Sequence, residues 1–503
     1  MTLFGTAGIR GPVRGEVTPD LALAVGRAAG RDGETFVLGR DGRTTGRGLT
    51  DAVAAGLQSA GADVNRLGQV PTPALAYAAR GRRGVMVTAS HNPPADNGLK
   101  LFVDGAEYDG DAEERVAGRV ADPGTPVSWG EWGDTERVDV LADYRRSVAE
   151  YVREVGPAGI VADRVEADET RVDASRDEAA GGEPLAGLCV AVDCGNGMAS
   201  VATPQVLDAL GATVVAVGAT VDGAFPARDS KPTPESLAEF RALLGDAEVS
   251  DEGDATGGRF DLGVAHDGDA DRTVVLTGDG SVVHEDTVLA ILAEHYVRRS
   301  GAGDPAVVTT PNASARVDER VSAAGGRVER VRLGALHEGI DAARTAGDAD
   351  TEVVFAGEPW KHVHPAWGGW IDGVATAGVV ATLVAGASAA SNGSGRRGLA
   401  ALREPVTERP YRKESVDCPE RHKRAAMTLV SERLDEAIDG AIDTTYGVRV
   451  DRADGSWVLV RPSGTEPCLR VYAESDEVET LADRAVGVVR EAVADASLSA
   501  GDG

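Results

Sequence analysis

Val85-Met86-Val87-Thr88-Ala89-Ser90-His91-Asn92-Pro93 places a serine hydroxyl in a tight polar loop directly after an apolar run. Leu262-Gly263-Val264-Ala265-His266-Asp267-Gly268-Asp269-Ala270-Asp271-Arg272 places three carboxylates at alternate positions after another apolar run. Short apolar runs that end in polar loops are typical of buried strands in an α/β sheet. A serine that can carry a phosphoryl group, with carboxylates that can hold Mg²⁺ against it, would form a phosphotransfer site.

The rest of the chain continues this alternation of strand-like runs and helical segments, which predicts an α/β fold. Three such units end near Ser90, Asp267 and Phe355. They share no convincing residue-by-residue repeat, so the recurrence is one of structure. A last unit has strand candidates at Trp457–Val460 and Leu469–Tyr472, followed by a helical segment.

The length of 503 residues exceeds what one hydrophobic core supports and predicts three or four domains. Three polar stretches are expected to be linkers or surface insertions: Asp163–Pro184, Gly245–Gly258 and Ser388–Gly398. The most apolar late segment, Gly378–Ala390, is short and rich in Gly and Ala, so we expect a packed helix rather than a membrane span.

The start of the chain lacks the charged and apolar regions of a signal peptide. The cysteines have no CxxC spacing, so neither a zinc site nor a disulfide framework is indicated. The expected compartment is therefore the cytoplasm.

The formal net charge of −30 argues against nucleic acid as a partner, because such binding needs a basic surface. Only five of the 51 basic residues are lysines: Lys100, Lys231, Lys361, Lys413 and Lys423. We hypothesise a high-salt cytoplasm, where screening relaxes the repulsion within so acidic a surface. The melting temperature should then rise between low and molar KCl. A melting temperature that stays flat over this range would support ordinary acidic solubility instead.

Ser90 is a candidate nucleophile. A serine hydroxyl is a weak nucleophile until neighbours take its proton or stabilise the product, and His91 and Lys100 lie close in sequence. Pro93 and Pro94 stiffen the loop. The G-x-S-x-G motif of serine hydrolases is absent here. Standing alone, the stretch is better explained as a capped turn.

Asp267, Asp269 and Asp271 form a candidate Mg²⁺ site. Alternate positions of an extended segment place their side chains on one side, and loop geometry can bring them together on a cation. Mg²⁺ prefers oxygen ligands and often takes a substrate phosphate as one of them. An EF-hand is excluded, because its loop needs Gly and Glu where Arg272 and Gly278 stand. An exposed acidic turn is the simple alternative.

Two further loops suit a phosphorylated sugar. Arg461-Pro462-Ser463-Gly464-Thr465-Glu466-Pro467 combines a forked cation with hydroxyl and backbone N–H groups that can surround a phosphate. Gly357-Glu358-Pro359-Trp360-Lys361-His362 places a carboxylate after a strand-like run, where it can accept two sugar hydroxyl hydrogen bonds. A hairpin turn and a surface loop are the respective alternatives. Phe4–Gly11 and Gly39–Arg43 are glycine-rich loops with cations, each a weak signal alone.

In this order along one chain, the motifs resemble those of the α-D-phosphohexomutases, the phosphoglucomutase/phosphomannomutase superfamily. The markers are FGTAGIRG at 4–11, the serine loop TASHNPPADNGLK at 88–100, the metal loop DGDADR at 267–272, the sugar loop GEPWKH at 357–362 and the phosphate loop RPSGTEPCLRVY at 461–472. The match covers essentially the whole chain, and several motifs in order are far more specific than any one.

The resemblance implies three related α/β domains with mixed sheets and a smaller C-terminal α+β domain around a central cleft. The expected limits are 1–150 with the serine loop, 151–280 with the metal loop, 281–400 with the sugar loop and 401–503 with the phosphate loop.

The resemblance also implies an isomerase that interconverts hexose 1-phosphate and hexose 6-phosphate through phosphorylated Ser90 and a bisphosphate intermediate. One Mg²⁺ would be held by Ser90, Asp267, Asp269 and Asp271. A hexose bisphosphate such as glucose bisphosphate would be the activator. The partner would be a sugar monophosphate, with no nucleic acid or membrane, and the enzyme would be a monomer or a small homo-oligomer.

Residue roles carry over by position in the motifs. The catalytic residues would be Ser90, His91, Lys100, Arg10 and Arg272. Those that contact the substrate would be Glu358, Trp360, Lys361 and His362 at the sugar, and Arg461, Ser463, Gly464, Thr465 and Arg470 at the phosphate that does not react.

The sugar loop departs from the family's usual GExSGH, because Trp360 and Lys361 replace Ser and Gly. The change adds bulk and charge where the sugar is bound. Glucose and mannose phosphates are the expected substrates, with a phosphoglucosamine mutase or a phosphopentomutase as alternatives. Asp96-Asn97-Gly98 resembles the glucosamine-type members, while Ala270 is common in archaeal-looking ones, in line with the halophile-like composition.

Two more distant alternatives lie outside the mutases. Asp269–Thr273 has the DxDxT shape of haloacid-dehalogenase-type phosphatases, but three residues separate it from the preceding strand. The second alternative is a sugar-phosphate binder without catalysis.

Overall fold

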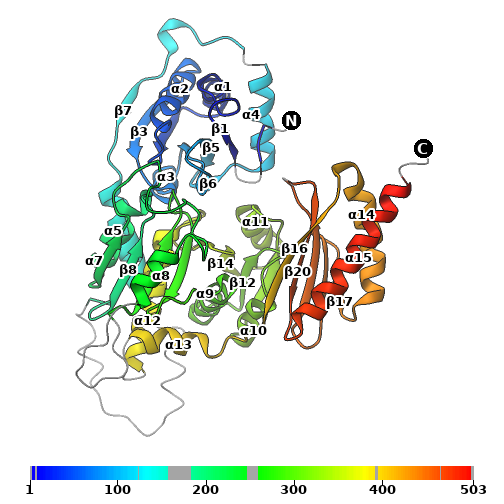
Figure 1. The fold of residues 1–503 in the computed structure, drawn as a ribbon. Coiled ribbons are helices and arrows are strands. Elements are labelled where there is room, and N and C mark those ends of the chain that lie inside the picture. Colours follow the sequence, from blue (N-terminus) through cyan, green and yellow to red (C-terminus); the bar gives the residue numbers. More distant parts are fainter. Residues whose placement is uncertain are drawn as a thin grey trace.

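The computed structural model describes residues 3–5, 8–122, 124–156, 183–245, 259–390, 395–464 and 466–499. Within these residues the strands form four sheets, which follow one another along the chain (Figure 1). The linkers expected at Asp163–Pro184 and Gly245–Gly258 lie largely outside the described residues. The linker expected at Ser388–Gly398 is wrong at both ends, because residues 388–390 end one helix (Gly373–Ala390) and residues 395–398 begin the next (Gly395–Arg403).

The first sheet has the strand order β1-β5-β4-β2-β3-β7, with β6 beside β5. Its strands are β1 (Ile9–Pro12), β2 (Thr35–Arg40), β3 (Asp63–Gln69), β4 (Arg83–Val87), β5 (Asp96–Val103), β6 (Ala106–Glu107) and β7 (Thr135–Arg137). The helices of this part are α1 (Pro19–Ala29), α2 (Gly46–Ser59), α3 (Thr72–Ala78), α4 (Gly110–Ala121) and α5 (Leu141–Val155). Side-chain caps define two of the helix starts: Thr18 accepts from the N–H of Leu21, and Asp109 from that of Ala112.

The second and third sheets have the orders β11-β10-β8-β9 and β13-β12-β14-β15. Their strands are β8 (Cys189–Asp193), β9 (Thr213–Val217), β10 (Leu262–His266), β11 (Thr273–Thr277), β12 (Asp304–Thr309), β13 (Arg327–Arg330), β14 (Thr351–Glu358) and β15 (Lys361–Val363). The helices are α7 (Thr203–Ala209), α8 (Ala238–Gly245), α9 (Glu285–Arg299), α10 (Ala315–Ala323), α11 (Leu336–Ala346), α12 (Gly373–Ala390) and α13 (Gly395–Arg403).

One strand arrangement occurs in all three of these sheets. The first strand (β2, β8 or β12) pairs in parallel with the second (β3, β9 or β13) and with the third (β4, β10 or β14). The third strand then pairs antiparallel with the fourth (β5, β11 or β15). The orders β5-β4-β2-β3, β11-β10-β8-β9 and β15-β14-β12-β13 are therefore equivalent. The serine, metal and sugar loops each join the third strand to the fourth, so they occupy the same place in three related domains.

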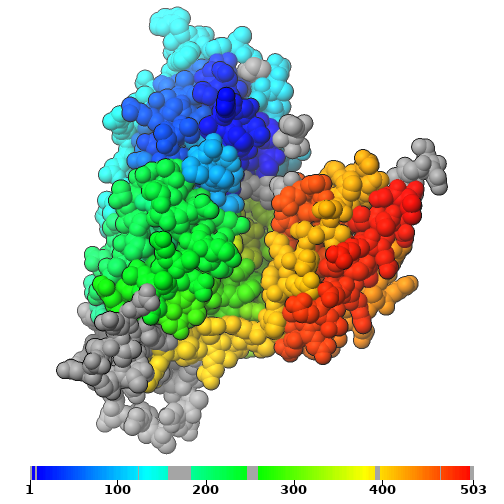
Figure 2. Space-filling model, viewed as in Figure 1, coloured from blue at the N-terminus to red at the C-terminus, as the bar shows by residue number. Residues whose placement is uncertain are grey.

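The fourth sheet is antiparallel, in the order β16-β20-β19-β18-β17. Its strands are β16 (Tyr411–Asp417), β17 (Ala441–Asp443), β18 (Val448–Asp451), β19 (Trp457–Pro462) and β20 (Cys468–Glu474), and its helices are α14 (Glu420–Ala437) and α15 (Val478–Ser499). Both helices pack on one face through a separate apolar core. Figure 2 shows this orange and red domain standing beside the blue and green ones, with a deep hollow between them. The phosphate loop joins β19 to β20.

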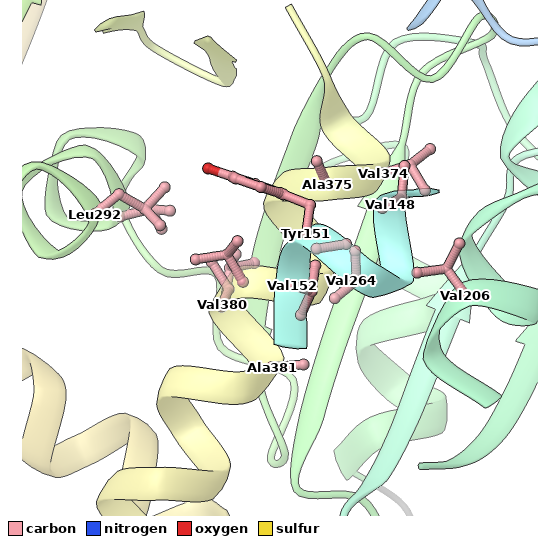
Figure 3. Close-up of a cluster of buried hydrophobic side chains, with 14 of the residues drawn as sticks. Val148, Tyr151, Val152, Val206, Val264, Leu292, Val374, Ala375, Val380 and Ala381 are labelled. Carbon is pink, nitrogen blue, oxygen red and sulfur yellow. The ribbon is translucent and has the colours of Figure 1, made fainter. Parts of the chain in front are cut away.

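Helix α12 lies at the centre of the first three domains. The helix is long and apolar enough to cross a membrane, but most of it is buried inside the protein. Figure 3 shows Val374 and Val380 of α12 close to Val152 of α5 and Val264 of β10. Helix α5 therefore shares one apolar core with elements of the second and third sheets.

A buried ion pair connects the C-terminal domain to the third. Arg316 of α10 donates to Glu474 of β20 at 3.0 Å, and Ser314 donates to the same carboxylate oxygen at 2.8 Å. The α/β fold with mixed sheets and an antiparallel C-terminal domain, as expected from the sequence, is confirmed. The domain limits remain a prediction.

Candidate active site

The serine loop begins where β4 ends and brings Ser90 to the metal loop. Ser90 is fully buried, and its Oγ donates to Asp267 Oδ2 at 2.6 Å, across 177 residues of chain. Its backbone has a φ of 52°, in the left-handed region that residues other than glycine rarely adopt. Such conformations cost about 1–3 kcal/mol and concentrate at functional sites.

Arg43 holds the backbone of the serine loop in place, a role that the sequence did not reveal. Its buried guanidinium donates to four backbone carbonyls of the loop: Ser90 (2.9 Å), Asn92 (2.6 Å), Pro93 (2.5 Å) and Asp96 (3.0 Å). Asp41 holds Arg43 at 3.1 Å and also accepts from the Thr88 hydroxyl at 2.7 Å. The only sequence signal is the glycine-rich Gly39–Arg43 stretch, which is weak by itself.

The metal loop brings three aspartates together, but not as an extended segment. Residues 267–272 lie outside the strands, and Ala270 has a φ of 61°. The expectation that alternate positions of an extended segment share a side is therefore wrong as an explanation, because a turn makes the side chains converge. Asp267, Asp269 and Asp271 are buried, and one ligand oxygen from each lies within 4.8 Å of the others.

Two cations and a hydroxyl surround these carboxylates. Lys100 Nζ donates to Asp271 at 2.7 Å and lies 3.6 Å from Asp269. Thr72 donates its hydroxyl to Asp269 at 2.6 Å, and the Arg272 guanidinium lies 3.8 Å from Asp267. Burial alone would lower the pKa of Lys100, but the nearby carboxylates outweigh it and raise that pKa. Lys100 therefore remains a cation and stabilises negative charge instead of accepting a proton.

The aspartates fit a divalent cation. Asp269 Oδ1 and Asp271 Oδ1 are buried and have no hydrogen-bond partner among the described residues. Burial, together with Asp271 and Asp269, raises the pKa of Asp267 well above its usual range. Two carboxylate oxygens without a partner in the described ranges, beside a third carboxylate in a buried cluster, fit the all-oxygen donor set that Mg²⁺ prefers.

The other predicted catalytic residues lie on either side of Ser90. His91 Nδ1 is 3.4 Å from Ser90 Oγ. Burial, with the positive charges of Arg272 and Arg10, lowers the pKa of His91 to about 2, so its ring is neutral. Arg10 lies on β1, and its buried Nε has no partner in the described part of the chain.

The sugar loop places its carboxylate beside its own lysine. Glu358 ends β14, and Lys361 Nζ lies 2.9 Å from Glu358 Oε1, with both side chains nearly buried. Trp360 has a φ of 69° and packs against the apolar core of the second domain. His362 is buried, which lowers the pKa of its ring to about 3.

The metal loop and the sugar loop line one pocket. Asp271 reaches it from the metal loop, and Glu358 and Lys361 from the sugar loop. The remaining lining comes from the first and third domains, and it includes Thr72, Glu107, His337 and Trp370. The metal loop and the sugar loop, about 90 residues apart in the chain, are therefore neighbours in space.

The phosphate loop lies on the C-terminal domain and lines a cavity of about 420 Å³. The lining includes Arg461, Ser463, Gly464 and Arg470, together with Arg332 and Leu333 of the third domain. Arg461 and Arg470 are cross-strand partners, so both point to the same face of the sheet. Thr465, predicted here, lies outside the described residues.

Lysine, which is rare in this chain, recurs in these loops. Besides Lys100 and Lys361, Lys423 donates to the phosphate-loop carbonyls of Ser463 (2.5 Å) and Glu466 (2.8 Å). Burial, together with the positive charges of Arg272, Lys413 and Arg470, lowers the pKa of Lys231.

Comparison with known proteins gives three matching family models. They are described as phosphoglucomutase/phosphomannomutase α/β/α domain I (residues 1–125), α/β/α domain II (residues 167–280) and C-terminal domain (residues 416–491). The matched regions include the serine, metal and phosphate loops.

Relatives of similar length support the same assignment. The chain is 38% identical over 488 residues to a phosphopentomutase of Thermococcus kodakarensis, covering 94% of each chain. It is 36% identical over 502 residues to a probable phosphoglucosamine mutase of Methanopyrus kandleri, covering 97% of this chain and 98% of the relative. A phosphoglucomutase/phosphomannomutase family protein from Burkholderia thailandensis superposes with a TM-score of 0.76 at 26% identity, covering 99% and 98% of the two chains.

Proposed function

Because the chain belongs to the α-D-phosphohexomutase superfamily, and is therefore a phosphomutase, we propose that it moves a phosphoryl group between the 1-position and the terminal hydroxyl of a sugar by way of Ser90. The observation that carries the proposal is the 2.6 Å contact between Ser90 Oγ and Asp267 Oδ2. It unites a nucleophile with a buried carboxylate cluster, although the two are far apart in sequence.

In the proposed reaction Ser90 starts in its phosphorylated form, having received the group from a sugar bisphosphate. The bond between Ser90 Oγ and phosphorus breaks, a bond from phosphorus to the sugar hydroxyl oxygen forms, and the hydroxyl proton passes to a group beside Ser90. The resulting bisphosphate reorients in the cleft, the bond between its other phosphorus and the sugar oxygen breaks as that phosphorus bonds to Ser90 Oγ, and the freed sugar oxygen takes the proton back. The enzyme thus ends each cycle as it began.

The residues of the chain supply position and charge for this transfer. Asp267, Asp269, Asp271 and an oxygen of phosphorylated Ser90 would hold Mg²⁺, which supplies charge neutralisation at the transferring phosphoryl group when bound. Lys100 and Arg272 add fixed positive charge at the same place. Arg461, Ser463, Gly464 and Arg470 hold the phosphate that does not react, which keeps the sugar in line with Ser90.

Glucose or mannose phosphate is the substrate that the sequence predicts, and a phosphopentose is the second candidate. The Lys361–Glu358 pair favours the second candidate, because it occupies one of the two carboxylate oxygens that would accept sugar hydroxyls. A pentose presents fewer hydroxyls than a hexose. Glucosamine phosphate is disfavoured, because its ammonium group would meet the positive charge of Lys361. The Thermococcus relative named as a phosphopentomutase points the same way.

Replacing Lys361 by glycine should shift the preference toward hexoses. The change frees Glu358 Oε1, and a hydrogen bond to a charged group contributes about 1.5–3 kcal/mol, or about 10- to 100-fold in rate. We expect kcat/KM for glucose 1-phosphate to rise by at least about 10-fold relative to ribose 1-phosphate. Lys361→Met is the matched variant, since it keeps the bulk of the side chain and removes its charge. If the ratio of kcat/KM for glucose 1-phosphate to that for ribose 1-phosphate is unchanged in both variants, the Lys361–Glu358 pair does not set the substrate preference.

The activity itself is tested with glucose, mannose, glucosamine and ribose 1-phosphates in high KCl. The mutase isomerises one of these sugars and releases little inorganic phosphate. A phosphatase that uses Asp269 would release phosphate in proportion to substrate consumed, and a binder would show affinity without turnover. Intact mass adds a second measurement, because a phosphoryl adduct on Ser90 is expected of the mutase alone.

A further inference from the structure

A cavity of about 630 Å³ opens on the first domain, on the side of β2 away from the serine loop. Four arginines from four different elements line it: Arg40 at the end of β2, Arg66 in β3, Arg137 at the end of β7 and Arg47 in the first turn of α2. Figure 1 shows β3 and β7 side by side in this domain, with α2 above them. The cluster stands out in a chain whose net charge is −30.

Strand register explains why the arginines converge. Arg66 is the cross-strand partner of Leu38 on one side and of Arg137 on the other. Partners on adjacent strands point to the same face, and Arg40 shares it because it lies two residues after Leu38. Leu38 packs in the core that α2 covers. The cavity therefore lies between the first turn of α2 and the carboxyl ends of parallel strands, where open α/β sheets bind their ligands.

The positive charge in this cavity is only partly compensated. Arg66 pairs with Asp51 at 2.5 Å. Arg40 donates to the backbone carbonyl of Asp41 at 3.0 Å, and neither Arg40, Arg47 nor Arg137 forms an ion pair within the described ranges. Burial lowers the pKa of Arg40; Asp41 and Asp51 oppose this effect, and the positive charge of Arg47 adds to it. An anion between these guanidinium groups would relieve their mutual repulsion.

We propose that this cavity is a binding site for a phosphate-bearing small molecule, separate from the catalytic cleft. Guanidinium groups match phosphate oxygens in geometry and charge, and Leu67 and Val138 provide a small apolar surface for the rest of the ligand. The end of β2 divides the two sites. Arg40 faces the cavity, whereas its neighbour Asp41 accepts a hydrogen bond from Thr88 of the serine loop.

The test uses inorganic pyrophosphate as the probe, titrated calorimetrically into the full-length protein with EDTA present. The wild-type protein should show two binding events, one in the cleft and one in the arginine cavity. In Arg47→Gln/Arg137→Gln the second event should weaken at least about 10-fold, and more so at low KCl, where screening is weak. Mutase activity of this variant should stay within about twofold.

Arg14→Gln/Arg115→Gln removes the same charge from exposed positions of the same domain outside the cavity. It should retain both binding events. A single event in the wild-type protein, two undiminished events in Arg47→Gln/Arg137→Gln, or an equal loss in the control variant would each overturn the proposal. The result does not depend on which sugar is isomerised, because the readout is binding and not turnover.

Discussion

Ser90→Ala is expected to lower the isomerisation rate by at least about a thousand-fold, which corresponds to about 4 kcal/mol of lost transition-state stabilisation. The substitution removes the atom that carries the phosphoryl group, and no water at that place can hand the group back. The loop should keep its shape, because Arg43 holds the backbone carbonyl of residue 90 and the Thr88 hydroxyl holds its N–H at 2.8 Å. The assay follows conversion of sugar 1-phosphate, and intact mass should show no phosphoryl adduct.

Ser200→Ala is the matched control for this variant. Ser200 is also a buried serine, but its hydroxyl donates to the carbonyl of Gly197 at 2.7 Å, away from the serine loop. Its rate should stay within a few-fold of the wild-type rate, and its melting temperature should fall at least as far as that of Ser90→Ala. If Ser90→Ala keeps more than about a tenth of the activity, the nucleophile is another group.

The strand ends were the part of the fold that local sequence predicted well. Val85–Val87, Leu262–Ala265 and Val353–Phe355 are short apolar runs, and each becomes the third strand of an equivalent sheet. Polar loops after such strands lie at one edge of a sheet, so candidate residues could be chosen without coordinates. The sequence did not reveal that the serine, metal and sugar loops occupy equivalent places, because the domains share strand order and not residues.

Backbone conformation and distant partners could not be predicted in this way. Ser90, Ala270 and Trp360 each adopt a positive φ, one in each loop, although none of them is a glycine. Their surroundings impose this conformation, so no local pattern reveals it. Arg43 contacts carbonyls about 50 residues away, and an arginine in a short glycine-rich stretch gives no sign of such contacts. Lys361 and Glu358 are close in sequence, but their pairing matters for the substrate only because both side chains are nearly buried, and the sequence does not show that burial.

Removal of the divalent ion should abolish turnover while leaving the fold intact. Without a bound cation, the positive charges near the three buried carboxylates are those of Lys100, Lys361 and the more distant Arg272, and phosphorylated Ser90 would add further negative charge. We expect activity in EDTA below about 1% of the initial rate, and recovery when Mg²⁺ is returned. The far-ultraviolet circular dichroism should not change, because, within the described residues, the apolar cores of the first and C-terminal domains contain no residue of the metal loop, and the core around α12 contains only Ala270 of that loop.

A thermal measurement separates loss of the ion from loss of a reactant. A ligand that binds only the folded state stabilises it by about 2.7 kcal/mol at a hundred times its Kd, so Mg²⁺ should raise the melting temperature of the wild-type protein. Asp269→Asn keeps the shape of a side chain whose Oδ1 has no protein partner in the described structure, but removes its charge. This variant should lose most of the Mg²⁺-dependent rise, whereas Asp143→Asn, at an exposed position on α5, should keep it. An equal rise in melting temperature in both variants, or turnover that resists EDTA, would show that the ion does not bind at these aspartates.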